Sequence, residues 1–214
     1  MQTALPEECT NTAALPELLQ ADLLENGELP ETRVLYSGIS WNRYLEIDRA
    51  FGDDRSSPRL FYLDGELEIV TTSNAHERIQ RVISYLVDEY FEREGIDTSP
   101  RGQTTVRLKE AGAEPDDAWC IGSDKSLPDI ALEIALSSGG IPKLKVYQRL
   151  EIPEVWIYRK RALQFYTLRD DRSGYDLKNG SRFAPNLDLA LLDRCLTIEN
   201  WNAARKAIRA GLGT

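Results

Sequence analysis

The sequence contains little of what builds a metal-binding finger or a disulfide scaffold. Its 214 residues include one histidine, His76, and three cysteines, Cys9, Cys120 and Cys195. Because no two cysteines form a CxxC pair and a second histidine is missing, an ordinary structural zinc site is excluded. An odd number of widely spaced cysteines also does not indicate a disulfide framework.

Long apolar segments are missing as well. No stretch approaches the ~18 consecutive apolar residues that a membrane helix needs. The N-terminus has no basic segment followed by an apolar run, so we expect no secretory signal. No basic amphipathic helix indicates binding to a membrane surface. These absences together predict a cytoplasmic protein with reduced thiols and no membrane partner.

The net charge of −9 is the opposite of what a simple nucleic-acid binder carries, but the charge is distributed unevenly. Residues 1–33 contain seven acidic residues and one basic residue, whereas residues 141–182 contain ten basic and five acidic residues. The basic excess lies close to the candidate site described below. Either a functional basic surface or an unevenly charged solvated surface accounts for it.

The chain divides into a short arm and one domain. Residues 1–33 are rich in Pro, Glu and Thr, and nothing anchors the short helix that residues 15–24 could form. We therefore predict an acidic N-terminal arm over residues 1–33 and a single domain over residues 34–214, a length that suits one hydrophobic core.

The periodicity of the domain predicts an α/β fold of the mixed α+β kind, with a mixed sheet flanked by helices. Asp64-Gly65 between two β-rich runs is a strong hairpin signal, and the apolar residues after Ser73 repeat with the helical period. Predicted helices cover residues 40–50, 73–94, 142–150 and 197–210. Predicted strands cover residues 60–63, 66–70, 104–109, 118–121, 129–136, 155–158 and 163–167, with a further short hairpin of 175–178 and 182–183.

One predicted strand carries a carboxylate where apolar residues are expected. In residues 129–136 the period of a strand divides the side chains into two faces. One face holds Ile130, Leu132, Ile134 and Leu136, and the other holds Asp129, Ala131, Glu133 and Ala135. Because so apolar a strand is typical of a sheet centre, Glu133 is costly to bury unless it is paired or binds a metal. Alternatively, its face of the sheet meets water.

Two further residues can act together with Glu133. Asp116, in Glu114-Pro115-Asp116, precedes a predicted strand, where a carboxylate can hold a hard cation, although Pro-Asp is also a common turn. Lys143 shares a helical stripe with Tyr147, so we expect it to face the apolar side and to pair with Glu133, or else to reach water.

Two carboxylates on Mg²⁺ with a nearby lysine make a coherent phosphodiesterase site. The metal polarises the phosphate and lowers the pKa of a bound water, and the lysine orients that water or stabilises charge that develops on phosphorus.

Several sequence blocks together resemble the Uma2 (DUF820) family, and cyanobacterial members in particular. The resemblance covers about residues 34–210. The blocks are Asp64-Gly65-Glu66-Leu67, Ser73-Asn74-Ala75-His76, Gly112-Ala113-Glu114-Pro115-Asp116, Pro128-Asp129-Ile130-Ala131-Leu132-Glu133-Ile134, Ser138-Gly139-Gly140-Ile141, Lys143-Leu144-Lys145-Val146-Tyr147 and Ile152-Pro153-Glu154-Val155-Trp156.

The resemblance implies a PD-(D/E)XK, restriction-endonuclease-like fold and a DNA endonuclease that uses Mg²⁺ or Mn²⁺. It implies Asp116 and Glu133 as catalytic metal ligands, with Lys143 supplying from the next helix the lysine that Ile134-Ala135 lacks. Glu66 and His76 are weaker catalytic candidates, and a histidine at a helix start is often structural.

A second function remains open from the sequence alone. The acidic net charge and the absent in-strand lysine favour a catalytically silent binding or assembly module that keeps the nuclease fold. A homodimer is a further expectation that the residues do not decide.

Overall fold

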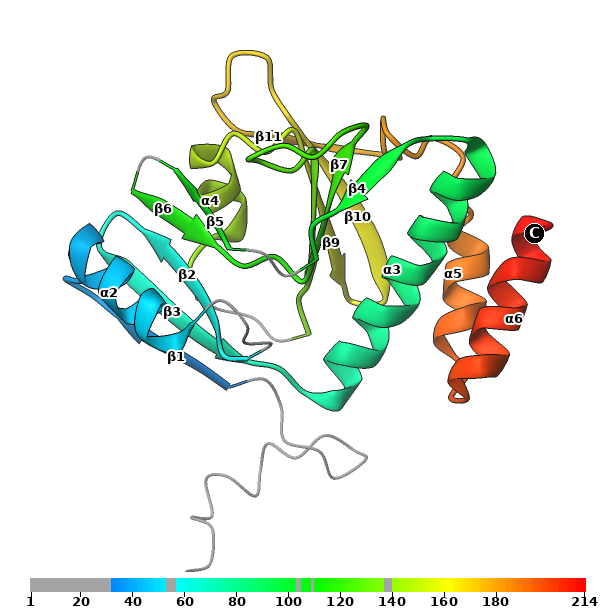
Figure 1. Ribbon diagram of the computed structural model, residues 1–214, viewed down its shortest axis with the longest axis horizontal. Helices are drawn as coiled ribbons and strands as arrows, with labels where there is room; N and C mark the ends of the chain where they lie inside the picture. The colour runs from blue at the N-terminus through cyan, green and yellow to red at the C-terminus, as the bar shows by residue number, and fades with distance from the viewer. Residues whose placement is uncertain (1–31, 53–56, 103–104, 109, 137–139) are drawn as a thin grey trace, which may run out of the picture. The chain divides into compact units, whose positions relative to one another are not determined.

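The computed structural model describes residues 32–52, 57–102, 105–108, 110–136 and 140–214, and within them the chain forms two sheets with helices packed against them (Figure 1). Most of the predicted acidic arm lies outside these residues. Strand β1 (Thr32–Tyr36) starts within the last two residues of the predicted arm and pairs with β3.

The smaller sheet has the strand order β1-β3-β2-β6-β5, with all neighbours antiparallel. It contains β2 (Arg59–Leu63), β3 (Glu66–Thr71), β5 (Val106–Leu108) and β6 (Ala111–Ala113), and the predicted hairpin around Asp64-Gly65 is confirmed as β2–β3. Helix α2 (Trp41–Phe51) begins after Ser40, whose Oγ accepts a hydrogen bond from Arg43 N. Tyr44 of α2 stacks on Tyr62 and covers one face of this sheet.

The larger sheet has the order β11-β10-β9-β8-β7-β4. Its strands are β4 (Thr98–Pro100), β7 (Asp117–Ile121), β8 (Ile130–Ile134), β9 (Glu154–Arg159), β10 (Ala162–Leu168) and β11 (Tyr175–Lys178). Among the strand pairs of the described residues only β8–β9 is parallel, and α4 (Lys143–Arg149) lies between these strands in the chain. The strands predicted over residues 118–121 and 129–136 correspond to β7 and β8, which are antiparallel neighbours.

Helices cover both faces of β8. On one face, Ile130, Leu132 and Ile134 join the main core with α3 (Asn74–Glu94), α5 (Leu189–Leu196) and α6 (Trp201–Leu212), which Figure 1 shows side by side. On the other face, Ala131 packs in a second core with α4 and the smaller sheet. The central, doubly covered position predicted for this strand is therefore confirmed.

The end of the chain differs from the prediction. Residues 182–183 form no strand, because β11 pairs with β10 and Glu154 instead accepts a hydrogen bond from Arg182 N. The last helix also begins later than predicted, because Asn200 caps α6 and Thr197 ends the unpredicted helix α5. The short strands β4 and β6 were also missed, since three residues are too few to show a period.

Two predicted strands are shorter in the structure. The strand predicted over 129–136 spans only Ile130–Ile134 in the structure. Asp129 lies outside it, where its carboxylate accepts a hydrogen bond from Ile121 N. The strand predicted over 104–109 appears as Val106–Leu108, and its two predicted end residues lie outside the described part of the chain. Within the described helices, none is both long enough and apolar enough to cross a bilayer.

Candidate active site

Glu133 is buried at the centre of the larger sheet, on the face of β8 that meets α4. Only 5% of its surface is exposed, and its Oε1 accepts a hydrogen bond from the Tyr147 hydroxyl of α4. Burial raises the pKa of the Glu133 carboxyl, and nearby Lys143 and the Tyr147 hydrogen bond oppose that rise. The main cause of the rise is therefore burial.

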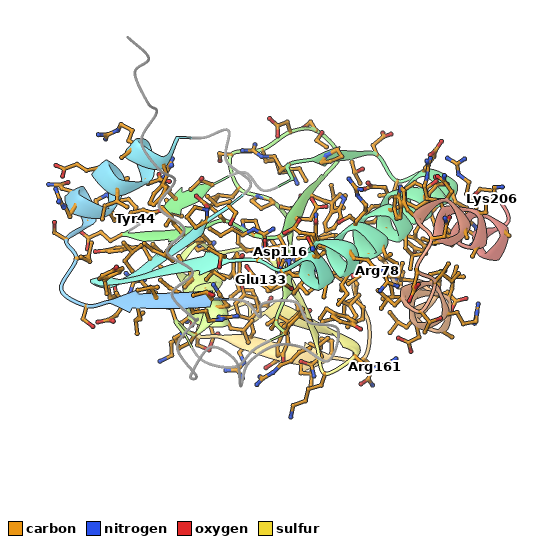
Figure 2. The ribbon with its side chains drawn as sticks, turned by 90° about the horizontal axis from the view of Figure 1, so that it is seen from below. Tyr44, Arg78, Asp116, Glu133, Arg161 and Lys206 are labelled. Atoms are coloured by element: carbon orange, nitrogen blue, oxygen red, sulfur yellow. The ribbon has the colours of Figure 1, made fainter. Side chains whose placement is uncertain are left out.

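Asp116 lies next to Glu133 because it is fixed to the same stretch of β8. Its backbone N donates to Leu132 O at 2.9 Å, and its Oδ2 accepts a hydrogen bond from Ile134 N. The side chain is almost completely buried. Figure 2 shows the labelled Asp116 and Glu133 near each other. The two predicted metal ligands are neighbours because Asp116 is hydrogen-bonded to Ile134, the residue that follows Glu133 in β8.

Asp116 is also held by two basic side chains. Arg59, at the start of β2, forms an ion pair with Oδ1 through Nη1, and His76 Nε2 lies 3.2 Å from Oδ2. Arg59 reaches Glu77 as well, at 3.4 Å. Burial lowers the pKa of the Arg59 guanidinium, whereas Glu77 and Glu133 act to raise it. Arg59 was missed from the sequence, although its position two residues before buried Phe61 indicates the same strand face.

Lys143 is inside the protein, as expected from its helical stripe, but its ion-pair partner is not the one expected. Its Nζ lies 3.4 Å from Oε2 of Glu68 and over the ring of Phe61. The expected ion pair with Glu133 is therefore corrected to one with Glu68, while Glu133 still interacts with Lys143 electrostatically. Burial lowers the pKa of Lys143 to about 8, against the attraction of both carboxylates.

Glu68, on β3, is the acidic residue that the hairpin brings to this cluster. It is fully buried, and it accepts hydrogen bonds from Arg33 Nη1 at 2.9 Å and from Ile141 N at 3.1 Å. Gly140 has a φ of +80°, and a Cβ there would lie 2.1 Å from Glu68 Oε1. A glycine is therefore required where the chain enters α4.

The structure separates the two weaker candidates. His76 is buried beside Asp116. Glu66 is half-buried near the hairpin turn, and its Oε2 accepts a hydrogen bond from Ser37 Oγ at 2.9 Å. Glu66 and Glu68 share one strand face, so the sequence pattern alone could not tell which of them reaches the interior.

Glu133 also borders a cavity of about 360 Å³, which is large enough for a small ligand. Its charged lining residues are Arg33, Glu133, Lys143 and Arg159. Glu114, the other acid of the Glu114-Pro115-Asp116 motif, instead accepts hydrogen bonds from Leu60 N and the Thr105 hydroxyl. Its role in the described structure is to fix β2.

The cluster thus combines two adjacent carboxylates, a buried lysine and an open cavity. Over the residues that the structure describes, no group of three or more His, Cys, Asp or Glu residues is arranged to hold a metal. A cation bound at Asp116 and Glu133 would therefore complete its coordination with water or with substrate oxygens.

Comparison with known proteins assigns the family. The family model of Uma2, described as "Putative restriction endonuclease", matches residues 41–199, which is more than half of the chain. The chain belongs to the Uma2 family. The resemblance noted from the sequence blocks is thereby confirmed.

A solved structure shows the same fold. A crystal structure described as a putative nuclease belonging to DUF820, from Anabaena variabilis ATCC 29413, matches with a TM-score of 0.53 and 14% identity. The match covers 74% of this chain and 99% of that one. The nuclease-like fold of this Uma2 domain is therefore confirmed. No curated protein matches the chain.

Proposed function

We propose that this Uma2 protein is a Mg²⁺-dependent endonuclease that hydrolyses DNA phosphodiester bonds. The observation that carries the proposal is Glu133, a buried carboxylate on a central strand that borders a cavity and adjoins Asp116. A buried carboxylate in this position lowers stability unless it is paired or binds a metal or ligand. Its presence therefore indicates a catalytic or binding role more than a packing role.

The residues present fit a magnesium ion. Mg²⁺ sites in proteins commonly use one or two carboxylates and leave the remaining positions to water and substrate phosphates. Asp116 and Glu133 would supply these carboxylates. Within the described residues Glu133 accepts one hydrogen bond, from Tyr147, which leaves its second oxygen available at the cavity. When bound, the ion would polarise the phosphate and acidify a water.

The other side chains of the cluster support that chemistry. Lys143, with a pKa near 8, is mostly cationic at neutral pH and can stabilise the charge that develops on phosphorus. The Tyr147 hydroxyl fixes the orientation of Glu133, and His76 and Arg59 fix that of Asp116. Glu68 and Phe61 hold the Lys143 ammonium beside the cavity.

One observation favours the second candidate, a catalytically silent binding or assembly module. Both oxygens of Asp116 already have partners, since Arg59 contacts Oδ1 while His76 and Ile134 N contact Oδ2. Metal binding at Asp116 therefore requires Arg59 to give way. In a silent module, the Arg59–Asp116 ion pair would instead be a permanent structural feature.

A cleavage assay separates the two functions. The full chain is incubated with DNA and with RNA in Mg²⁺, in Mn²⁺ and in EDTA. The nuclease proposal predicts metal-dependent DNA cleavage that Glu133→Gln abolishes and that Glu66→Gln retains, because Glu66 lies at the hairpin turn beside Ser37. Absence of cleavage with both metals, or equal cleavage by the Glu133→Gln variant, would favour the silent module.

A further inference from the structure

The cavity beside Glu133 has walls that suit an apolar ligand with a few polar groups. Its apolar walls come from strands β8 and β9 and from the start of α4, and include Ile134, Ile141, Leu144 and Ile157. Gln164 and Tyr166 of β10 add hydrogen-bonding groups. An apolar cavity with a few polar groups is the usual form of a specific small-ligand site.

The amide of Gln164 is oriented by its neighbour. The Tyr166 hydroxyl donates a hydrogen bond to Gln164 Oε1 at 3.0 Å. Within the described residues, the Nε2 of Gln164 makes no hydrogen bond, so it can donate to a ligand in the cavity. A side-chain amide beside apolar walls matches the acceptor-rich edge of a nucleobase.

The charge of the cavity matches phosphate. Arg33, Lys143 and Arg159 line it together with one carboxylate, Glu133. Arg33 and Lys143 both contact Glu68, whereas the Arg159 side chain makes no ion pair with any described residue. Arg159 is thus a cation available to an anionic ligand at the mouth of the cavity.

Arg159 also connects the cavity to a second basic feature, the basic turn, which consists of Arg159, Lys160 and Arg161. Arg159 pairs with Ala162, so Lys160 and Arg161 form a two-residue hairpin turn with φ of 51° and 62°. Such turns favour Asn and Gly, and a long side chain held at positive φ lowers stability at a cost in backbone strain.

The basic turn keeps its cations exposed in spite of that cost. Arg159 borders both the cavity beside Glu133 and a neighbouring hollow lined by Lys160 and Arg161. Figure 2 shows Arg161 at the edge of the molecule, away from Asp116 and Glu133. A continuous basic path therefore runs from the candidate active site to the tip of the β9–β10 hairpin.

We propose that the cavity binds one unpaired nucleotide beside the scissile phosphate and that the basic turn contacts the adjoining phosphates, so that the substrate is single-stranded DNA. This inference rests on the proposed nuclease function. A base in a duplex is stacked and paired, and entry into a cavity of about 360 Å³ would require it to be unpaired and flipped out. In a single strand the free-energy cost of unstacking one base is much lower, and the strand can make base contacts together with phosphate contacts.

Binding in EDTA tests the inference without cleavage. A short labelled single strand and a blunt duplex of the same sequence are titrated with the full chain, and fluorescence anisotropy is followed. We expect the single strand to bind at least about tenfold more tightly than the duplex. Arg159→Gln and Gln164→Leu should each weaken single-strand binding roughly five- to tenfold. Lys206→Gln, an exposed lysine on α6 far from the site in Figure 2, is the matched control and should leave binding unchanged.

The outcomes separate this inference from the nuclease proposal. Equal affinity for strand and duplex, no binding of either, or losses no larger than that of Lys206→Gln overturns the single-strand inference. If DNA is cleaved with Mg²⁺ but without a preference for single strands, only this inference fails. If single-strand binding depends on Arg159 and Gln164 but the protein cleaves no DNA with either metal, the single-strand inference is supported and the nuclease proposal fails. Melting curves of each variant check that the fold is retained.

Discussion

The two faces of strand β8 have opposite characters although they alternate along the same five residues. Ile130, Leu132 and Ile134 pack against α3, α5 and α6 in an apolar core. Glu133, on the other face, contacts Tyr147 and lies in the field of Arg59 and Lys143. One face is arranged for packing, and the other holds charges that burial makes costly.

The two faces of β8 should contribute differently to stability and to function. A buried ion pair is weak evidence for stability, because desolvation offsets most of its attraction, whereas removal of one partner is strongly destabilising. Stability should therefore come from the apolar face. The charged face should lose stability when one partner is removed, and should lose function when the charge of Glu133 is removed.

Removal of Arg59 should give the largest loss of stability. Arg59→Leu leaves Asp116 buried without its cation, and we expect the free energy of unfolding to fall by about 3–5 kcal/mol. Urea denaturation measures this, with the exposed Arg43→Leu as the control. A loss no larger than that of the control would show that Asp116 does not depend on Arg59.

On the apolar face, Leu132→Ala should lower the free energy of unfolding by about 2–5 kcal/mol, because it opens a cavity in the main core. Cleavage per folded molecule should stay unchanged, since this side chain points away from the candidate site. If the activity of the folded variant fell as far as that of Glu133→Gln, the two faces would not be functionally separate.

The sequence revealed this alternation but not the partners of the charges. The period of two placed Glu133 opposite the apolar residues, and the structure confirms that division. It could not show that Lys143 pairs with Glu68, because that contact joins a helix to a strand far apart in the chain. Arg59 was missed for a different reason: its strand face could be predicted, but an arginine at a strand start is normally exposed.

Local signals also explain which elements were predicted. Ser40 and Ser73 cap helices that begin where the sequence predicts them, because a side-chain oxygen before an amphipathic run is a local signal. The eight-residue helix α5 was missed, and its C-cap Thr197 was taken as the start of the next helix. Strand β1 pairs with β3, and such pairing is decided by tertiary contacts that no local pattern contains.

Gly140→Ala should have an intermediate effect on the charged face. The new methyl group would meet Glu68 at a positive φ, and we expect a loss of about 1–3 kcal/mol together with weaker cleavage as Lys143 loses its partner. Gly122→Ala is a matched control, because Gly122 has the same φ of +80° with nothing within 4 Å. Equal losses in the two variants would show that backbone strain alone, and not contact with Glu68, requires the glycine.

Titration of Lys143 should change the free energy of unfolding by a small amount for each pH unit. Its pKa is about 8 in the folded protein and 10.5 ordinarily, so between these values the unfolded chain binds more protons. Lys143 therefore makes stability rise with pH over this range, by at most about 1.4 kcal/mol per pH unit. The Lys143→Met variant should lack this rise, and cleavage by the wild type should fall above pH 8 as the ammonium is lost. Identical pH dependence of unfolding in both proteins would contradict a buried, titrating Lys143.

The most direct test of the metal-site proposal is the effect of Mg²⁺ on the stability of the wild type and of Glu133→Gln. An ion that binds only the folded state at ten times its Kd should stabilise the wild type by about 1.4 kcal/mol. We expect this gain, measured by thermal or urea unfolding, in the wild type and none in Glu133→Gln, which should be at least as stable as the wild type in EDTA. An equal gain in both proteins, or none in the wild type at millimolar Mg²⁺ or Mn²⁺, would contradict it.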